Sequence, residues 1–294
     1  MTDILVIGSV NLDLSASVSR LPKPGETVTG ATLQRFPGGK GANQALAARR
    51  LGADVTLIAC VGDDNVASEA FALLKEGGVD LSRCVVHPEA GTGVALISVA
   101  DSGENCIVVA PGANARLSLE HIDMPTAAAM ICQLEVPGNT IVTAAERFDG
   151  LFCVNLAPAR DIDDRIIERA DVIVVNETES AWYGERLSLC KGMVVTTHGA
   201  AGAEIRADGK VVATTKAHRV EAIDTTGAGD AFTAALVVAL VEQMSPDDAL
   251  RFACAAGSLS ATRRGAQPSL PTRQELEAFL QSRWKDDGNS SPME

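Results

Sequence analysis

The chain alternates between short runs of apolar residues and longer segments whose apolar positions recur at helical spacing. The apolar runs are rich in β-branched residues and lie at 4–8, 55–62, 128–134, 151–155, 171–176 and 193–197. Helices are predicted at 40–51, 65–76, 161–169, 228–243, 246–263 and 273–282. Continuous apolar strands separated by amphipathic helices are typical of a mostly parallel sheet covered on both faces. We therefore predict an α/β fold, a three-layer sandwich whose central sheet is flanked by helices.

Two stretches depart from this rhythm. Residues 13–36 and 92–109 alternate polar with apolar side chains and contain turn sequences such as "DSGEN", a pattern that predicts antiparallel strands. Two such insertions are expected to form a small β-sheet that serves as a lid or as a contact between subunits. A further hairpin is predicted in "AEIRADGKVVATT", with Asp208 and Gly209 at its turn.

Composition and charge narrow the functional classes. With 294 residues, of which 46% are hydrophobic, the chain can bury a sizeable core. No internal repeat or interdomain linker is visible, so residues 1–284 are expected to form one domain and the polar segment 285–294 a frayed tail. The formal charge of -13 argues against nucleic acid or an anionic membrane as the main partner.

Cysteine usage and the apolar runs indicate a cytoplasmic protein. The seven cysteines are scattered and form no C-x-x-C pair, so buried free thiols in a reducing compartment are expected. The opening "MTDILVIGSV" has no basic region typical of a signal peptide. The longest apolar run, "AFTAALVVALV", stops at Glu242 and is too short to cross a bilayer.

The segment "FPGGKGANQA" places a lysine after two glycines and ahead of a predicted helix. A P-loop requires an earlier glycine and a hydroxyl residue after the lysine. The first of these positions holds Gln34 and the second Gly41. The motif therefore fails at both ends, and a phosphate site must lie elsewhere.

The segment "EAIDTTGAGDAFTAALVVAL" offers such a site. Gly227, Ala228 and Gly229 precede or open a long apolar helix, so their amides and that of Asp230 can point at an anion at the positive helix end. The Asp230 carboxylate would face whatever occupies this nest, which suits a base taking a proton from an attacking hydroxyl. Taken alone, helix capping by Asp224 or Asp230 explains the pattern equally well. A dinucleotide fingerprint is less suitable, because Phe232 stands where the third glycine belongs.

Seven motifs in order give the chain a resemblance to the ribokinase (PfkB) family of carbohydrate kinases, from residue 3 to about residue 283. They are "GSVNLDL", "GGKGANQA", "QLEVP", "NETE", "TTHGAAG", "DTTGAGDAF" and "TRRGAQPS". The resemblance implies ATP-dependent phosphorylation of a pentose, D-ribose at its 5-hydroxyl, beneath a β-lid. It assigns Asp230 as the base and the amides of 227–230 as the anion hole, in preference to capping.

The resemblance also implies a sugar pocket lined by Asn11, Asp13, Gly39, Lys40, Asn43 and Glu135, together with Asp230. Asn11 and Asp13 are two apart on an extended segment and share a face, so both can bond vicinal hydroxyls. Lys40 and Asn43 are three apart on one helical face and can point the same way. Ordinary turn chemistry at a strand end is the alternative for Asn11 and Asp13.

For the nucleotide, the resemblance implies contacts from Asn176, Thr197, Gly199, Gly202 and Gly229, with adenine near Cys254. Glu179 is implied to order water around Mg²⁺, which keeps much of its hydration shell. The alternative for "NETE" is a helix N-cap with an acidic first turn, and both roles are compatible. The four histidines show no ligand spacing, which disfavours a metalloenzyme.

A monovalent cation site, for K⁺, is implied behind the nest. Asp224 and Ser269 would supply side-chain oxygens, and the backbone oxygens would come from Thr226, Ser260, Arg263 and Gly265. Such an ion would act on rate by preorganising the amides. The alternative is that "TRRGAQPS" is a plain helix stop, with Gly265 as the cap and Pro268 as the breaker.

The sequence departs from the family in three places. Cys254 stands where ribokinases often have histidine, Gly227 where they often have alanine, and the divergent "DMPTAAAM" is expected to alter the pocket floor. Other acceptors remain open, namely deoxyribose, a nucleoside or a ketose, as does a sugar-sensing protein on the same fold. The polar and apolar lid is expected to join a second copy in a homodimer.

Overall fold

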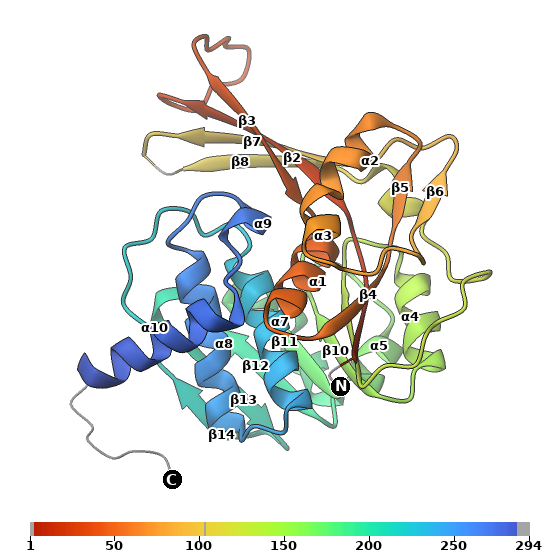
Figure 1. Cartoon of the computed structure of the whole chain (residues 1–294), viewed down its shortest axis with the longest axis vertical. Helices are drawn as coiled ribbons and strands as arrows, with labels where there is room; N and C mark the ends of the chain where they lie inside the picture. The colour runs from red at the N-terminus through yellow and green to blue at the C-terminus, as the bar shows by residue number, and fades with distance from the viewer. Residues whose placement is uncertain (1–2, 103, 287–294) are drawn as a thin grey trace.

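A computed structural model describes residues 3–102 and 104–286 of the chain. Its largest element is an eight-stranded sheet in which six neighbouring strands are parallel and two at one edge are antiparallel (Figure 1). The strand order is β14 (Lys210–Thr215), β13 (Ala203–Ala207), β12 (Met193–Thr197), β11 (Val172–Asn176), β10 (Leu151–Asn155), β9 (Ala129–Gln133), β1 (Asp3–Ile7) and β4 (Asp54–Ile58). The predicted mostly parallel sheet is confirmed.

Helices cover both faces of this sheet (Figure 1). They are α1 (Lys40–Arg50), α2 (Asn65–Ala70), α3 (Ala72–Glu76), α4 (Gly138–Arg147), α5 (Asp164–Arg169), α6 (Glu177–Tyr183), α7 (Ala228–Val241), α8 (Pro246–Ser260), α9 (Ala266–Ser269) and α10 (Arg273–Asp286). Three 3₁₀ turns are η1 (Gly112–Arg116), η2 (Gly184–Leu189) and η3 (Gly199–Ala201).

Two hydrophobic cores lie on opposite faces of the sheet, because successive side chains of a strand point to opposite sides. In β1, Ile4 and Val6 pack in a core with α1, α7 and α8. Leu5 and Ile7 of the same strand pack in a second core with α4 and α5. The continuous apolar runs are thus strands buried on both faces, which is the reason for the three-layer prediction.

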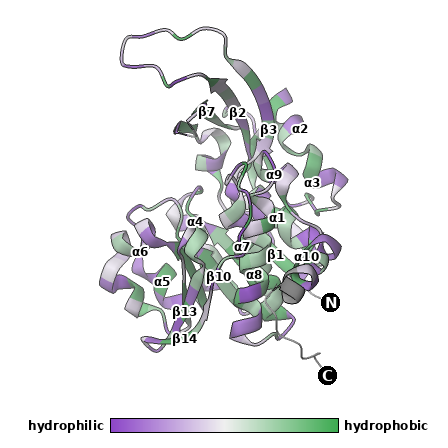
Figure 2. Ribbon diagram, turned by 90° about the vertical axis from the view of Figure 1, so that its left-hand side faces the viewer, coloured by the Kyte–Doolittle hydropathy of each residue, from purple (hydrophilic) through white to green (hydrophobic). Residues whose placement is uncertain are grey.

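A second, four-stranded sheet projects from one end of the body (Figures 1 and 2). Its strand order is β3 (Thr32–Gly38), β2 (Asn11–Val18), β7 (Gly93–Ala100) and β8 (Asn105–Ala110). The outer pairs are antiparallel, as predicted, but the central pair of β2 and β7 is parallel. Both central strands leave the body at the same level, with Asn11 paired to Gly93. We call β3, β2, β7 and β8 the projecting sheet.

Several element boundaries differ from the sequence prediction. The apolar run 55–62 is two strands, because the chain breaks at Ala59 and β5 (Cys60–Gly62) pairs with β6 (Val85–His87) in a separate sheet. The helix expected at 65–76 is interrupted at Phe71. The ten-residue helix α4 and the three-residue strand β6 were not predicted. The predicted hairpin is confirmed, with Asp208 and Gly209 both at positive φ.

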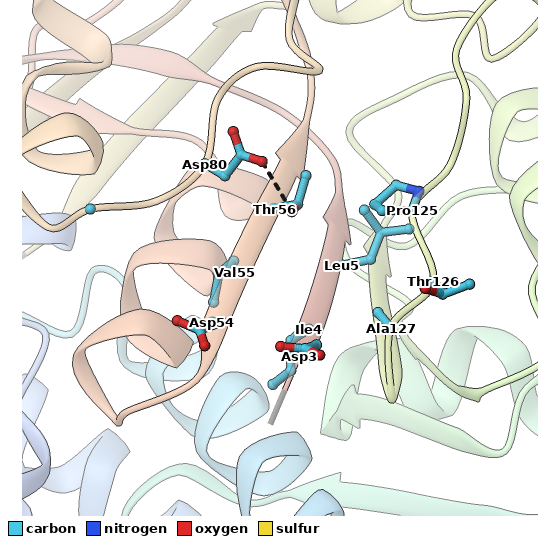
Figure 3. Close-up of a pocket in the computed structure, with 11 residues that line it drawn as sticks. Asp3, Ile4, Leu5, Asp54, Val55, Thr56, Asp80, Pro125, Thr126 and Ala127 are labelled. Atoms are coloured by element: carbon cyan, nitrogen blue, oxygen red, sulfur yellow. Dashed lines mark hydrogen bonds between the residues drawn. The ribbon is translucent and has the colours of Figure 1, made fainter. Parts of the chain in front are cut away.

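The segment expected to form the pocket floor lies elsewhere. Pro125, Thr126 and Ala127 line a small cavity of about 270 Å³ beside the beginnings of β1 and β4 (Figure 3). Ala128 donates its N–H to the carbonyl of Asp3, at the opposite end of β1 from Asn11. The expectation that this segment shapes the pocket is therefore wrong.

The carboxy-terminal boundary also shifts. The last helix, α10, continues to Asp286, two residues beyond the predicted end of the domain. The remainder of the expected tail, 287–294, lies outside the described residues. Within 3–102 and 104–286, no helix combines the length and apolar character needed to cross a bilayer.

Candidate functional site

The predicted site residues gather where the parallel strands end. Asn11 follows β1, Glu135 follows β9, Asn176 is the last residue of β11, and Thr197 ends β12. Asn155, which was not predicted, ends β10 at the same edge. In open α/β sheets, ligands bind outside the carboxyl ends of the strands. Helices α1 and α7 begin at this same edge, and they pack against each other. The edge therefore combines polar strand ends with two positive helix ends.

The start of α1 is pressed against the chain that leaves β1. A Cβ added to Gly41 would lie 2.5 Å from the backbone nitrogen of Ser9, so only glycine permits this approach. Ala42 donates its N–H to the carbonyl of Ser9 at 2.9 Å. The "GGKG" segment is thus a packing device that carries Lys40 and Asn43 to the end of β1.

The start of α7 is open around Gly229. The N-cap residue Gly227 is left-handed, with φ 80°, a conformation that other residues adopt only with strain. Gly229 is exposed, and nothing lies within 4 Å of the place where its Cβ would be. Ala228 donates its N–H to the Thr225 carbonyl at 3.1 Å, so the free space at the positive helix end lies around Gly229, as an anion site requires.

Asp230 lies in the first turn of α7, but it does not cap that helix. Its side chain is 5% exposed and accepts two hydrogen bonds from α1. Asn43 Nδ2 donates to Oδ2 at 2.8 Å and Gln44 Nε2 donates to Oδ1 at 2.9 Å. No side chain caps α7, so the capping interpretation of Asp230 is wrong.

Burial and charge act against each other on Asp230. Burial raises the pKa of its carboxyl, and the charge of Lys40 and the Asn43 and Gln44 hydrogen bonds oppose the rise. Glu135 adds to the rise. A buried carboxylate that is held by donors and has a raised pKa is suited to accept a proton.

Lys40 stands among acidic groups of several elements. Burial disfavours its charged form, but the carboxylates of Asp230, Glu135, Glu179 and Asp13 outweigh this and raise the pKa of the ammonium group. Its backbone N–H donates to Glu135 Oε2 at 3.2 Å, and Ser9 Oγ donates to the same oxygen at 2.5 Å. Lys40 is therefore a fixed positive charge among the predicted sugar and phosphate contacts.

Asp13 is buried in β2 of the projecting sheet, 7% exposed. Burial first, and then the charges of Glu135 and Asp230, raise its pKa to about 7, although Lys40 opposes them. The contribution of Asp230 means that the two carboxylates lie within electrostatic reach of each other. Placing two buried carboxylates so close costs free energy, which ordinary turn chemistry at a strand end does not require. The arrangement therefore favours a binding role for Asp13.

Asn11 is oriented by a residue that the sequence did not reveal. Asn114 of η1 donates Nδ2 to Asn11 Oδ1 at 2.8 Å and also bonds both backbone groups of Val10. All three groups are buried. Asn114 follows the last strand of the projecting sheet, so it ties the root of that sheet to the predicted sugar contact.

A cavity of about 710 Å³ separates the projecting sheet from the body. Asp13 and Phe36 line it from the projecting sheet, and the body contributes the loop 222–226 and the residues 264–266. Its polar wall thus includes the approach to α7. Asp230 itself is not among the residues that line this cavity, whereas Asp13, which interacts electrostatically with Asp230, does line it.

The "NETE" segment at the start of α6 has both of its expected roles, as a helix cap and as part of the predicted nucleotide site. Asn176 Oδ1 accepts from the Glu179 N–H and Glu179 Oε2 accepts from the Asn176 N–H, each at 2.8 Å, which is a capping box. Burial raises the pKa of Glu179, against the Asn176 hydrogen bond and the charge of Lys40. Glu179 is therefore a helix cap that also faces the site.

The remaining predicted nucleotide contacts lie in two places. Thr197 ends β12, and Gly199 and Gly202 follow in a turn closed by His198 N–H to Gly202 O at 2.7 Å. The space at Gly199 is open. Cys254, by contrast, lies on α8 with its side chain in the hydrophobic core, and burial raises its pKa to about 12.

The predicted cation residues form a bridged pair of loops. Asp224 accepts from the Thr226 N–H and the Gly265 N–H, both at 2.9 Å. Ser260 Oγ and Ser269 Oγ are 2.7 Å apart and fully buried. The helix-stop alternative is wrong in detail, because α8 is capped by Ala261, whereas Gly265 precedes α9 and Pro268 lies within it.

Sequence reasoning missed five buried polar residues of the site, Ser9, Gln44, Asn114, Gln133 and Asn155. Gln133 and Asn155 are the final residues of apolar strands, and a polar residue at that position was the available signal. Gln44 adjoins Asn43 in a segment already singled out. Asn114 carries no sequence signal, since only the folded chain brings it to Asn11.

Comparisons with known proteins agree with this geometry. The profile of the pfkB family of carbohydrate kinases matches residues 1–273. A ribokinase of Haemophilus influenzae is 39% identical, with 95% of this chain and 98% of the relative covered. The crystal structure of a Thermotoga maritima ribokinase matches with a TM-score of 0.88 at 32% identity, over 96% of this chain and 100% of that one. The structure of an Arabidopsis thaliana ribokinase complexed with ribose and ATP has a TM-score of 0.86 at 29% identity, over 95% and 98%.

Proposed function

This chain belongs to the pfkB family of carbohydrate kinases, and on that premise we propose that it transfers the γ-phosphoryl group of ATP to the 5-hydroxyl of D-ribose. The observation that carries the proposal is the placement of Asp230. Its carboxylate is held by two side-chain amides in the first turn of α7, where the space around Gly229 is open. The similarity to ribokinases, one of them complexed with ribose and ATP, favours ribose as the acceptor.

In the proposed reaction, Asp230 accepts the proton of the sugar hydroxyl as its oxygen bonds to the γ-phosphorus. The bond between that phosphorus and the β,γ-bridging oxygen breaks, and ADP leaves with the electron pair. The amides of 227–230 and the Lys40 ammonium group offset charge on the transferring group. Asp230 is suited to this step because burial raises its pKa while Lys40 and two donors keep the carboxylate oriented.

The sugar is proposed to lie between the projecting sheet and the body. Asn11 and Asp13 would bond its hydroxyls from β2, and Gly39, Lys40, Asn43 and Glu135 would line the side nearer α1. The unpartnered and buried Asn43 Oδ1 supports a ligand here, since buried polar atoms are rarely left without a partner. The projecting sheet would act as a lid that excludes water from ATP.

The residues present fit Mg²⁺ bound through the substrate. Glu179 is a single buried carboxylate facing Lys40, and the described residues contain no cluster of three or more His, Cys, Asp or Glu side chains able to hold a metal. A single carboxylate acting through water suits an ion that keeps its waters and binds phosphates. Bound there, Mg²⁺ would neutralise phosphate charge; Glu179 would orient its water ligands.

The nucleotide is proposed to lie along the ends of β11 and β12, against Asn176, Thr197, Gly199 and Gly202, with its phosphates at Gly229. The open space at Gly199 and Gly229 supports close approach of a ligand to the backbone. Cys254 would lie behind the adenine rather than bond it, because its side chain belongs to the core.

A K⁺ site fits the loops joined by Asp224. The proposed donors, Asp224, Thr226, Ser260, Arg263, Gly265 and Ser269, supply only oxygens, which suits a hard monovalent ion. With K⁺ in place of Na⁺ at equal ionic strength, we expect a higher kcat and a higher melting temperature, because an ion bound only to the folded state stabilises it. Asp224→Ala should abolish both differences; an undiminished K⁺ response in that variant would contradict the site.

Sugar affinity should depend on the ionisation of Asp13. Because its raised pKa is about 7, the ionised acceptor form is lost as the pH falls below neutrality. We expect the Kd for ribose, measured by equilibrium dialysis without ATP, to increase about tenfold from pH 8 to pH 6, since the ionised fraction falls by about that factor. Asp13→Asn should bind more weakly at every pH and with a flat profile. A pH-dependent Kd in this variant would assign the titration to another group.

The function itself is tested by ADP release with a panel of acceptors, run with Mg²⁺. We expect ribose to give the highest kcat/KM, above deoxyribose, ketoses, hexoses and nucleosides. Preference for a nucleoside or a ketose would keep the mechanism and replace the acceptor. Sugar binding without sugar-dependent ADP release would instead support a sensor.

We further propose that the projecting sheet joins a second copy in a homodimer. The edge strand β8 is exposed along its whole length, and Ile107, Val108 and Val109 are exposed apolar residues. An open apolar edge is a site for pairing with another chain.

We also propose a cytoplasmic location. All seven cysteines are free thiols, as is usual for proteins of a reducing compartment.

A further inference from the structure

A chain of buried side-chain amides ends on Asp230. Gln133 Nε2 donates to Gln44 Oε1 at 2.6 Å, and Gln44 Nε2 donates to Asp230 Oδ1 at 2.9 Å. Gln44 and Gln133 are fully buried. These two residues come from α1 and from the last position of β9, so the base on α7 is connected to the central sheet.

The neighbours of Gln44 fix which way its amide points. The Gln133 donor selects the Gln44 oxygen, which leaves the Gln44 NH₂ group to face Asp230. Asn155 has the same effect from β10, because its Nδ2 donates to the Val174 carbonyl at 3.1 Å and its Oδ1 therefore faces Gln44 Nε2 at 3.3 Å. A reversed Gln44 amide would place its oxygen against a carboxylate, which only accepts hydrogen bonds.

We propose that Gln44 is a positioning residue for the base Asp230, and that Gln133 acts through it by locking the orientation of its amide. This inference rests on the proposed function and deepens it. Gln44 lies behind the carboxylate as one of two fixed donors. Asn43 is the other, at Oδ2. A carboxylate offers about four acceptor positions, so two remain for the sugar hydroxyl.

Two effects follow from a donor at this place. The hydrogen bond holds the carboxylate plane, so that a lone pair faces the hydroxyl without a loss of rotational freedom during the reaction. It also stabilises the ionised form, which is the form that acts as a base. In the absence of Gln44, the burial of Asp230 would be opposed only by Lys40 and Asn43.

The charges around Asp230 define what a pH profile would report. Lys40 faces it from α1, and Glu135 faces it from the loop after β9. Asp13 lies within electrostatic reach on β2. Burial and nearby carboxylates raise the pKa of Asp13 to about 7, so its ionisation would affect ribose binding. The measurement is therefore made at saturating ribose, where kcat does not depend on ribose affinity.

The test compares kcat against pH for wild type, Gln44→Met and Gln133→Met at saturating ribose and ATP. Methionine keeps the length of glutamine and removes its donor and acceptor. For Gln44→Met, we expect the acidic limb to move about one unit to higher pH and the plateau to fall about tenfold, as for one lost hydrogen bond to a charged group. Gln133→Met should shift the limb in the same direction by less, although its side chain does not contact Asp230. The KM for ATP should stay within about twofold.

Thr233→Val is the matched control. Thr233 lies one turn along α7, is fully buried and donates to the Gly229 carbonyl at 2.8 Å, so this change also removes a buried hydrogen bond from the same helix. We expect a lower melting temperature and an unmoved acidic limb. If Gln44→Met does not fold, Gln133→Met carries the test.

The outcomes separate the inference from the function. An unmoved acidic limb in both glutamine variants, with kcat lowered only as far as in the control, would overturn the positioning role while leaving the kinase intact. Absence of ribose-dependent ADP release in wild type would overturn the proposed function instead. Equal shifts in Thr233→Val and Gln44→Met would also overturn the inference, because the shift would then follow from general loosening of α7.

Discussion

Replacing Asp230 by asparagine is expected to lower kcat by roughly 10²- to 10⁴-fold, the usual contribution of a positioned general base. Asparagine keeps the shape of the side chain and cannot take the hydroxyl proton. The two amide donors of Asn43 and Gln44 would then face a side chain with one acceptor oxygen in place of two. Steady-state ADP release across pH 6–9 measures the loss, which should not be recovered at high pH.

Binding must be measured alongside turnover for this variant. We expect Asp230→Asn to bind ribose and ATP with dissociation constants within about fivefold of wild type, because the other proposed contacts remain. Thermal melting checks the fold. A folded Asp230→Asn protein that turns over at a normal rate would remove Asp230 from the mechanism altogether.

The second large effect is expected at Asp13. Asp13→Ala should weaken ribose binding on the order of 100-fold, since it removes a charged acceptor of two hydroxyls in a buried site. The KM for ATP should change little, because Asp13 lies on the projecting sheet and the proposed nucleotide contacts follow β11 and β12. Isothermal titration with ribose and saturation kinetics with ATP separate the two.

Acceptor choice gives this prediction a second readout. We assign the 2-hydroxyl of ribose, which deoxyribose lacks, to the hydroxyls that Asp13 bonds, so wild type should prefer ribose and Asp13→Ala should discriminate less. Asp54→Ala is a suitable control, because Asp54 forms a surface ion pair with Arg49 at the far end of β4 and should leave both sugars unaffected. Undiminished discrimination in Asp13→Ala would place the 2-hydroxyl elsewhere.

The sequence predicted the body of the fold well, for a physical reason. Strands buried on both faces must be apolar throughout, and all six apolar runs contain strands of the observed sheets. The prediction was poorer for short elements and for strands that pair with strands far away in the sequence. The parallel pairing of β2 with β7 depends on two segments about eighty residues apart leaving the body together, which alternation within each segment cannot reveal.

The site was predicted in its residues more than in its contacts. Asp230 and Asn43 were both named, yet their hydrogen bond across 187 positions of sequence was not. Local patterns suggested that Asp230 caps its own helix, and only the packing of α1 against α7 shows where its oxygens point. Gln44 and Gln133 are polar residues inside apolar text, a signal that acquires meaning once their shared acceptor is known.

The root of the projecting sheet couples movement of that sheet to sugar binding. Its inner strands begin side by side at Asn11 and Gly93, and Asn114 fastens Asn11 where the last strand returns to the body. A rocking movement of the sheet must therefore carry the hydroxyl-binding side chains of β2 with it. Sugar binding and the tilt of the projecting sheet are then linked equilibria. A substitution or contact at the distant strand tips that favours one tilt therefore changes sugar affinity, and bound sugar changes the tilt equilibrium by the same coupling free energy.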